Sequence, residues 1–240
     1  MTTQFFFEKY SHMARSEQGL AAAGEWPSLR PLLPDFTGLR LLDLGCGYGW
    51  HCRYAAAHGA ASALGIDLSE KMLAVAREKT DPASPIEYRR AAMEDVDFAP
   101  ASFDVVLSSL ALHYVEDFPA LAGRVFRWLA PGGQFIFTAE HPVFTAQGSQ
   151  DWLYGPDGEI ACFPVDRYYC EGKRTAHFLG EAVTKYHRTL TTYLEGLLRL
   201  GFVLEHVVEP APPENMLDLP GMRDELRRPM MLIVCARRPG

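Results

Sequence analysis

The stretch from residue 41 to residue 69, LLDLGCGYGWHCRYAAAHGAASALGIDLS, constrains the fold of this chain more than any other part. Its apolar runs at 41–42 and 63–66 are typical of buried strands, and residues 50–58 suit a helix between them. Gly45, Gly47 and Gly49 precede that helix, and alternate glycines remove the Cβ atoms that would keep a ligand away from the backbone. Asp67 follows about 20 residues later, where a carboxylate can accept hydrogen bonds from ribose hydroxyls. The stretch therefore predicts a nucleotide-type strand–helix–strand unit.

The details of the turn separate two classes of cofactor. A dinucleotide-binding turn has the form G-x-G-x-x-G and places a pyrophosphate at the amino end of the helix. Here the glycines read G-x-G-x-G, Trp50 occupies the third glycine position of the dinucleotide pattern, and Asp43 precedes the turn. A carboxylate at that point would repel a pyrophosphate but suits a ligand with an ammonium group. The pattern resembles motif I of the class I S-adenosylmethionine-dependent methyltransferases.

This resemblance implies an α/β fold, with a Rossmann-like, seven-stranded, mostly parallel sheet that has helices on both faces and an antiparallel last strand. It also implies S-adenosyl-L-methionine as the cofactor, with its methionine part over Gly45, Cys46 and Gly47. Its amino group would lie near Asp43, and its ribose hydroxyls would bind Asp67. Further cofactor contacts are expected from Leu68, Met72, Met93, Glu94, Ser108, Ser109 and Tyr10.

Residues 91–98 resemble the adenine-side loop of the family, with one departure. Ala92 stands where an Asp commonly receives the adenine amino group. The backbone of Met93 can still meet the edge of the adenine ring, and Glu94 or Asp95 could replace the missing carboxylate. An aromatic residue near the amino terminus, Tyr10 or Trp26, is a candidate to cover the cofactor, although either could simply pack on the sheet.

The rest of the chain fits one domain over residues 1–240. Residues 1–38 are expected to form a helical cap, and strands are expected at 86–90, 102–109, 134–138, 202–208 and 229–236. Helices are expected at 69–79, 118–129 and 189–200, with the Pro131–Gly133 segment ending the second of these. Residues 143–188 interrupt the alternation and are rich in aromatics, so we interpret them as an insertion with short strands near 161–164 and 182–187. We expect it to act as a lid for a planar or apolar small molecule; the alternative is that it only covers the sheet edge.

Composition excludes several classes of partner. The formal net charge is −7, and no lysine- or arginine-rich run is present, which argues against nucleic acid. Residues 108–111 also lack the two prolines of the Asn/Asp-Pro-Pro-Tyr/Phe motif of nucleic-acid amino-methylating enzymes. Five cysteines, an odd number without metal-site spacing, favour a reduced cytoplasmic protein without a metal. We expect neither a secretion signal nor a membrane span, and the oligomeric state stays open.

Methyl transfer from a sulfonium is an in-line displacement, so the protein mainly aligns the reactants. A general base helps if the accepting atom must lose a proton. His141, at the end of the fifth strand, and His187, where the insertion returns to the core, are the predicted bases because histidine titrates near neutral pH. The alternative for each is a structural histidine held by hydrogen bonds.

Three functions remain to be compared. The first is a methyltransferase that acts on O, N or C of a small-molecule metabolite. The second is a non-catalytic protein that binds S-adenosylmethionine or S-adenosylhomocysteine on the same fold. The third, a nicotinamide oxidoreductase, is disfavoured by Asp43 and Trp50.

Overall fold

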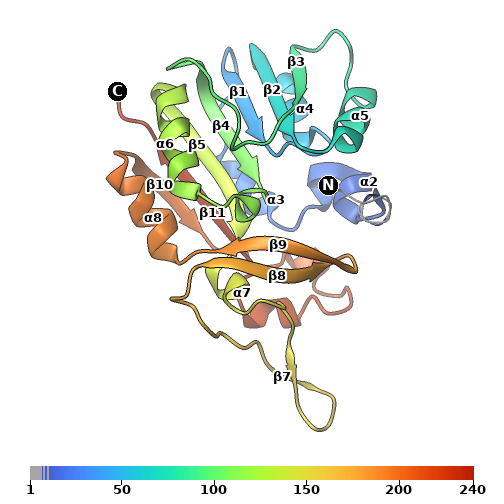
Figure 1. Ribbon diagram of the computed structural model, residues 1–240. Coiled ribbons are helices and arrows are strands. Elements are labelled where there is room, and N and C mark those ends of the chain that lie inside the picture. Colours follow the sequence, from blue (N-terminus) through green and yellow to red (C-terminus); the bar gives the residue numbers. More distant parts are fainter. Residues whose placement is uncertain (1–6, 8, 10) are drawn as a thin grey trace.

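The computed structural model describes residues 7, 9 and 11–240, and its centre is a seven-stranded sheet with the strand order β10-β11-β5-β4-β1-β2-β3 (Figure 1). Within it, β1 to β5 pair in parallel, and β11 is antiparallel to both β5 and β10. This topology confirms the predicted fold class. The strands are β1 (Arg40–Leu44), β2 (Ser62–Asp67), β3 (Ile86–Arg90), β4 (Phe103–Ser109), β5 (Leu129–Glu140), β10 (Val203–Val208) and β11 (Met231–Arg237).

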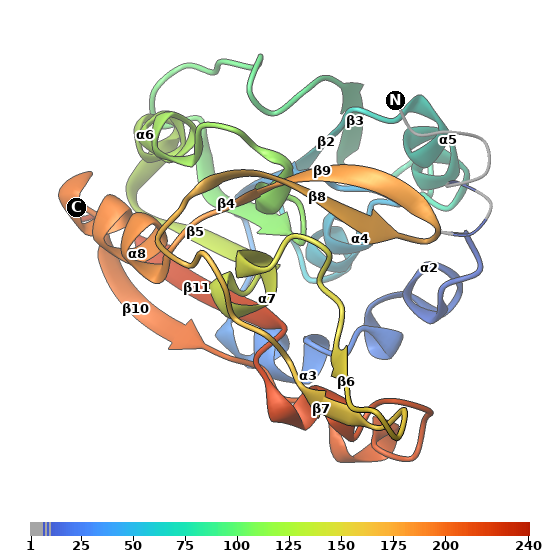
Figure 2. The same ribbon diagram turned by 60° about the horizontal axis from the view of Figure 1, so that its bottom comes forward.

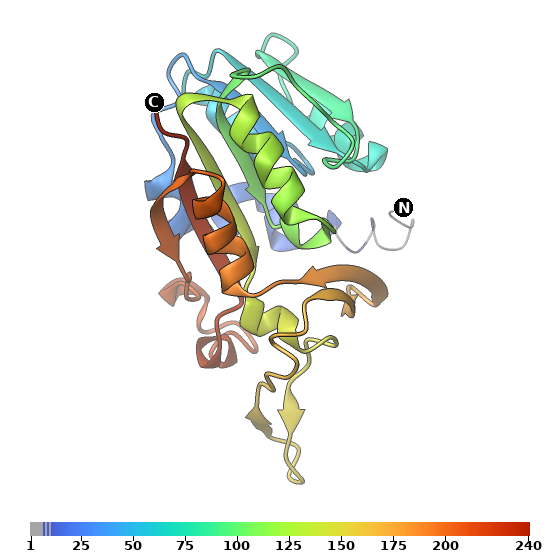
Figure 3. The ribbon, with the colours of Figure 1, turned by 60° about the vertical axis from the view of Figure 1, so that its left-hand side comes forward.

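Helices cover both faces of this sheet. Figure 3 shows α6 and α8 side by side on one face. Two of the described helices have hydroxyl side chains as N-caps: Ser69 accepts from the backbone N–H of Met72, and Thr189 accepts from that of Thr192. The helices are α2 (Ala14–Gln18), α3 (Trp26–Leu29), α4 (Trp50–Ala57), α5 (Glu70–Glu78), α6 (Phe118–Trp128), α7 (Pro142–Ala146) and α8 (Leu190–Arg199), with short 3₁₀ turns η1 (Gly19–Ala22), η2 (Arg30–Leu32), η3 (Leu112–Tyr114), η4 (Glu214–Met216) and η5 (Asp224–Arg227).

Two hydrophobic cores follow from the alternation of side chains along the strands. Leu42 and Leu44 of β1 pack with the apolar faces of α6 and α8, whereas Leu41, the residue before Leu42, packs with residues of α3, α4 and α5 on the other face. The same alternation continues in the neighbouring central strands, which are buried on both sides. The sheet is therefore held rigidly, and its edge offers a fixed base for a binding site.

One predicted boundary is wrong. We expected Pro131–Gly133 to end the helix before the fifth strand, but α6 ends at Trp128 and β5 already begins at Leu129. Gly132 lies within this strand at φ +81°, and its N–H donates to the carbonyl of Arg238. The segment joins the sheet because the chain end passes beside it and supplies backbone partners.

The segment between β5 and α8 forms two small antiparallel hairpins outside the main sheet. The first pairs β6 (Leu153–Tyr154) with β7 (Ile160–Cys162), and its turn projects outward (Figure 3), while Arg227 of η5 donates to the carbonyls of Ile160 and Ala161. The second pairs β8 (Gly172–Phe178) with β9 (Glu181–His187) and lies across the carboxyl ends of the central strands (Figures 1 and 2). Strands were expected near the positions of β7 and β9, whereas β8 was not anticipated. No helix within the described residues is long and apolar enough to cross a membrane.

Candidate functional site

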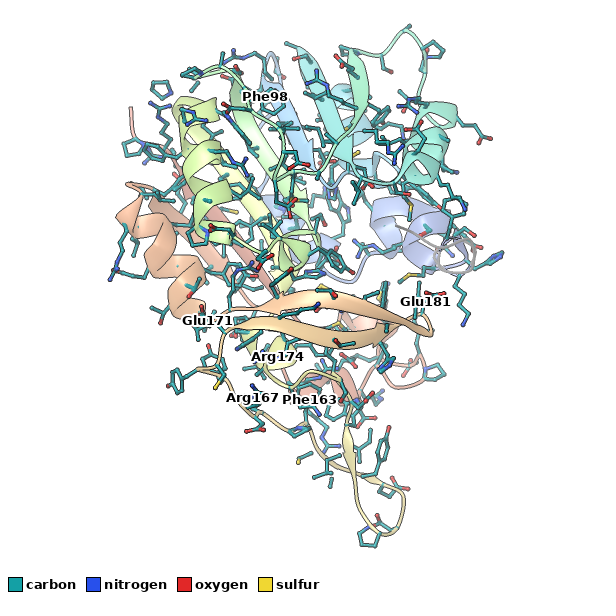
Figure 4. The ribbon with its side chains drawn as sticks, viewed as in Figure 1. Phe98, Phe163, Arg167, Glu171, Arg174 and Glu181 are labelled. Atoms are coloured by element: carbon teal, nitrogen blue, oxygen red, sulfur yellow. The ribbon has the colours of Figure 1, made fainter. Side chains whose placement is uncertain are left out.

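A cavity of about 940 Å³ lies at the carboxyl ends of the parallel strands. Its walls come from the glycine turn after β1, the residues that follow β2 and β3, the ends of β4 and β5, the η3 turn, the start of β11, the N-terminal helices, and the β8–β9 hairpin. Glu181, at the tip of that hairpin, lines the cavity (Figure 4). This is where ligands bind in open α/β sheets, because the strand order reverses at β1 and β4. The size is that of a typical small-molecule site.

The glycine turn has a backbone that ordinary side chains would not tolerate. Gly45, Gly47 and Gly49 have φ values of +77°, +53° and +70°. A Cβ at Gly45 would lie 2.4 Å from the Cβ of Ala111, and one at Gly49 would lie 2.1 Å from the hydroxyl of Tyr88. At Gly47 an added Cβ would meet no described protein atom within 4 Å, and this residue lines the cavity. The turn thus keeps its backbone close to β4 and open towards a ligand.

Asp67 holds this turn in place. Its Oδ2 accepts from the N–H of Gly47 at 2.9 Å, and its Oδ1 accepts from the N–H of Ser69 at 2.8 Å. Burial raises the pKa of Asp67, although both backbone donors work against that rise. Each carboxylate oxygen has a second acceptor site, so Asp67 can still receive two ligand hydroxyls from the cavity that it lines. The sequence indicated that Asp67 binds ligand hydroxyls, but it gave no sign that Asp67 also supports the glycine turn.

Asp43 is fully buried at the end of β1. Its Oδ2 accepts a weak hydrogen bond from the thiol of Cys52 at 3.6 Å, and its Oδ1 has no hydrogen-bond partner in the part of the chain that the structure describes. Burial raises the pKa of Asp43 to about 7. A buried carboxylate with one unused oxygen, two residues before the turn, suits a ligand that brings positive charge.

Most of the predicted cofactor contacts line the cavity, and two of the described ones do not. Ser108 is buried, and its hydroxyl donates to the carbonyl of Leu44 at 2.8 Å. Asp43 is fully buried in β1 and is not a lining residue, and Tyr10 lies outside the described residues. Those that line it are Gly45, Cys46, Gly47, Asp67, Leu68, Met72, Met93, Glu94 and Ser109.

Trp50 lines the cavity, whereas Trp26, one of the two aromatics expected to cover the cofactor, does not. Trp26 packs edge-on against Tyr54, with ring centroids 4.9 Å apart. Trp50 lines the cavity, and a Cβ at Gly19 would lie 2.7 Å from its ring. The glycine allows the η1 turn to approach the first residue of α4. A tryptophan in the third glycine position was visible in the sequence, but its packing partner was not.

The predicted bases, His141 and His187, have protein neighbours at both ring nitrogens. In His141, Nδ1 accepts from the N–H of Val143 at 3.0 Å, and Nε2 lies 2.8 Å from Oε1 of Glu209. In His187, Nε2 donates to the carbonyl of Tyr168 at 2.8 Å, which leaves Nδ1 to accept from the hydroxyl of Thr145. Burial lowers the pKa of each. Neither appears among the described residues that line the cavity, and their role as bases stays a prediction.

We expect His187→Ala to lower the free energy of unfolding by about 2–4 kcal/mol. The substitution leaves a buried hydroxyl and a partly buried carbonyl without their histidine partner and removes a fully buried ring. Urea unfolding followed by circular dichroism measures the change. His177→Ala, at an exposed position on the neighbouring strand β8, is the matched control and should change stability by less than about 0.5 kcal/mol. Equal losses in the two variants would contradict the structural role of His187.

A buried polar cluster that the sequence did not reveal completes the cavity wall. Glu140, at the end of β5, and Lys185, on β9, form an ion pair with Oε1 and Nζ 2.5 Å apart. Gln150 donates to the second oxygen of Glu140 at 2.8 Å and accepts from Lys185 at 2.9 Å. Burial would raise the pKa of Glu140, but the charge and hydrogen bonds of its neighbours outweigh that effect and lower it. The carboxylate is therefore ionised at neutral pH.

His113 adds a hydrogen-bond donor to this cluster. Burial lowers the pKa of His113 to about 4, so the ring is neutral at pH 7. Its Nδ1 accepts from the N–H of Glu140 at 3.4 Å, which places the ring proton on Nε2. Arg188, also buried, donates to the carbonyls of Leu112 and Glu116 and fixes the η3 turn that carries His113. His113 lines the cavity as a donor and not as a base.

Comparison with known proteins identifies the family. A family described as "Methyltransferase domain" matches residues 42–137. A crystal structure from Listeria monocytogenes, assigned to the S-adenosylmethionine-dependent methyltransferases, is 53% identical with a TM-score of 0.88, and the match covers 92% of this chain and 100% of that one. Another, the S-adenosylmethionine-dependent methyltransferase from Mesorhizobium loti, is 48% identical with a TM-score of 0.84 over the same shares.

Curated protein sequences match this chain over different shares of its length. An uncharacterized protein of Haemophilus influenzae is 33% identical over 97% of this chain and 94% of its own length. A malonyl-[acyl-carrier protein] O-methyltransferase of Pectobacterium atrosepticum is 32% identical over 52% of this chain and 47% of its own length. The chain thus spans about half of that named relative. Together with the full-length structural matches, this shows that the chain belongs to the S-adenosylmethionine-dependent methyltransferases and uses S-adenosyl-L-methionine as its cofactor.

Proposed function

We propose that this enzyme transfers the methyl group of S-adenosylmethionine to an O, N or C atom of a small molecule. The observation that carries the proposal is that a single cavity runs from the glycine turn and Asp67 to the polar cluster at His113, Glu140 and Lys185. It therefore offers room for a second molecule beside the cofactor. Relatives that match about half of this chain are named as O-methyltransferases and as phosphoethanolamine N-methyltransferases, so the accepting atom stays open.

The residues of the cofactor end fit S-adenosylmethionine. The open backbone at Gly47 suits close approach of the methionine part, Asp67 suits the ribose hydroxyls, and the unused oxygen of Asp43 suits the amino group. Met93 and Glu94 line the cavity after β3, where the adenine ring is expected. When bound, the cofactor supplies an activated methyl group and its own leaving group. The protein then contributes alignment, which is worth about 7–11 kcal/mol of the barrier in well-oriented reactions.

The N-terminal segment and the insertion close the two remaining sides. We assign residues 1–38 as a cap and residues 143–188 as a substrate lid, because Met13 and Glu25 of the first and Phe178 and Lys185 of the second line the same cavity. Both described hairpins lie outside the main sheet, and only β8–β9 reaches the cavity. The five cysteines are free thiols in the described structure, which supports the proposed reducing, cytoplasmic location.

The test combines binding with transfer. Calorimetry should show that S-adenosylhomocysteine binds and that NAD does not. A methyl-transfer screen on pooled small metabolites should then produce S-adenosylhomocysteine with the wild type, and Asp67→Ala should fail in the same pool. Binding without any transfer across the screen would favour the non-catalytic alternative, and binding of NAD in place of S-adenosylhomocysteine would overturn the proposal.

We expect cofactor affinity to rise by about tenfold between pH 6 and pH 7.5. The pKa of Asp43 in the folded protein is raised to about 7, so the carboxylate gains its charge over this interval and attracts the ammonium group more strongly. The sign is opposite for the ligand-free protein, whose stability falls as pH rises through the same interval because the folded state binds the extra proton. Isothermal titration calorimetry measures the affinity. Asp43→Asn is the control, and an equally steep profile in that variant would contradict this account.

A further inference from the structure

We propose, on the basis of the function above, that the methyl acceptor is uncharged or cationic at neutral pH and carries no phosphate or carboxylate. The structure assigns this selectivity to the buried Glu140–Lys185 pair. Both side chains line the cavity, and both are largely shielded from solvent.

The strand order locates the acceptor end of the cavity. The cofactor residues follow β1, β2 and β3, which occupy one half of the sheet. His113 follows β4, and Glu140 ends β5, which are the next strands on the other side of β1. Lys185 reaches the same point from β9, across the opening. The cluster therefore lies beyond the cofactor end, where a second molecule would bind.

Each Arg or Lys side chain that lines the cavity in the described part of the chain already has a largely buried carboxylate partner. Among the residues that the structure describes, Arg15 and Lys185 are the Arg and Lys side chains that line the cavity. The guanidinium of Arg15 lies 2.5 Å from Oε1 of Glu25, which is 2% exposed, and Lys185 lies 2.5 Å from Glu140. Three further acids line the cavity: Asp67, Glu94 and Glu181. An anionic acceptor would thus meet carboxylates in excess and would have to break a buried pair, which is strongly unfavourable.

The remaining polar atoms suit a neutral or positively charged acceptor. His113 presents a neutral Nε2–H, which can donate to an oxygen or nitrogen of the acceptor without requiring charge. Oε2 of Glu25 is buried without a hydrogen-bond partner in the described structure, and it can accept from a hydroxyl or an ammonium group. Phe178, Val183 and Met231 supply apolar wall between these polar groups. Together these groups suit a compact, partly apolar methyl acceptor that has one hydrogen-bond donor and one hydrogen-bond acceptor.

The test uses inorganic phosphate as the probe, titrated calorimetrically into protein that is saturated with S-adenosylhomocysteine. We expect the wild type to bind phosphate no better than a non-specific background. Glu140→Gln keeps the shape of the side chain but leaves Lys185 without its counter-charge, so it should gain affinity for phosphate by at least about tenfold, the gain that one charge-assisted hydrogen bond supplies. The double variant Glu140→Gln/Lys185→Met should lose that gain.

Glu94→Gln is the matched control, because it removes the same charge from the same cavity and releases no buried cation. Phosphate binding by the wild type, an equal gain in the control, or no gain in Glu140→Gln would each overturn the proposal. If Glu140→Gln does not fold, Glu25→Gln releases Arg15 in the same way and should show the same gain. Binding of S-adenosylhomocysteine is measured in the same samples. If the wild type did not bind S-adenosylhomocysteine, that result would count against the proposed function. The phosphate titration tests only the proposed selectivity for the acceptor.

Discussion

Replacing Asp67 by alanine is expected to weaken S-adenosylmethionine binding by about 10²–10⁴-fold. Two charge-assisted hydrogen bonds to the ribose are at stake, each worth about 1.5–3 kcal/mol, and tenfold in affinity corresponds to about 1.4 kcal/mol. The structure adds a second reason, because Asp67 also accepts from the N–H groups of Gly47 and Ser69 and so supports the turn that receives the methionine part. Calorimetric titration with S-adenosylhomocysteine measures the loss.

Glu70→Ala provides the comparison for this prediction. Glu70 follows shortly after Asp67 in the first turn of α5, carries the same charge, and forms an exposed ion pair with Arg77. Exposed pairs contribute about 0–1 kcal/mol, so affinity in that variant should stay near the wild-type value. Wild-type affinity in Asp67→Ala would remove Asp67 from the cofactor site.

Two alanine substitutions in the glycine turn are expected to fail in different ways. Gly45→Ala should lower the free energy of unfolding by about 2–5 kcal/mol, because it combines a left-handed backbone with a Cβ 2.4 Å from the Cβ of Ala111. Gly47→Ala meets no described protein atom and should cost only about 1–2 kcal/mol. Its new methyl group is nevertheless at the cavity wall, so it should weaken cofactor binding by at least about tenfold.

Gly132→Ala separates backbone strain from crowding. Gly132 has φ +81°, an added Cβ there would meet no described atom within 4 Å, and the residue does not line the cavity. This variant should therefore lose stability through backbone strain alone and should bind the cofactor normally. Urea unfolding and titration with S-adenosylhomocysteine are measured on all three proteins. If Gly45→Ala were no less stable than Gly132→Ala, the close approach of the turn to β4 would not be what requires a glycine at position 45.

The two predicted histidines show where reasoning from single residues stops. His141 and His187 were chosen because histidine titrates near neutral pH, and because His141 stands at the end of the fifth strand and His187 stands where the insertion returns to the core. In the fold, the ring of His141 accepts from the N–H of Val143 in α7, and His187 joins α7 to the loop at Tyr168. The positions of these two residues in the sequence indicated the carboxyl edge of the sheet. The direction and the hydrogen-bond partners of each ring, however, depend on segments far away in the sequence. His113, which does line the cavity, gave no stronger signal than these two.

The sequence by itself determined the cofactor half of this enzyme. That half is built from one continuous strand–turn–helix–strand unit, in which glycine conformation and a carboxylate at fixed spacing are local properties that can be recognised before folding. Only the tertiary structure decided the acceptor half, where Glu140 and Lys185 are 45 residues apart and Glu140 and His113 are 27 apart. They meet because β4 and β5 are neighbours in the sheet and a hairpin crosses their ends. The charge balance of a cavity is a property of such neighbours, and no local pattern in the chain encodes it.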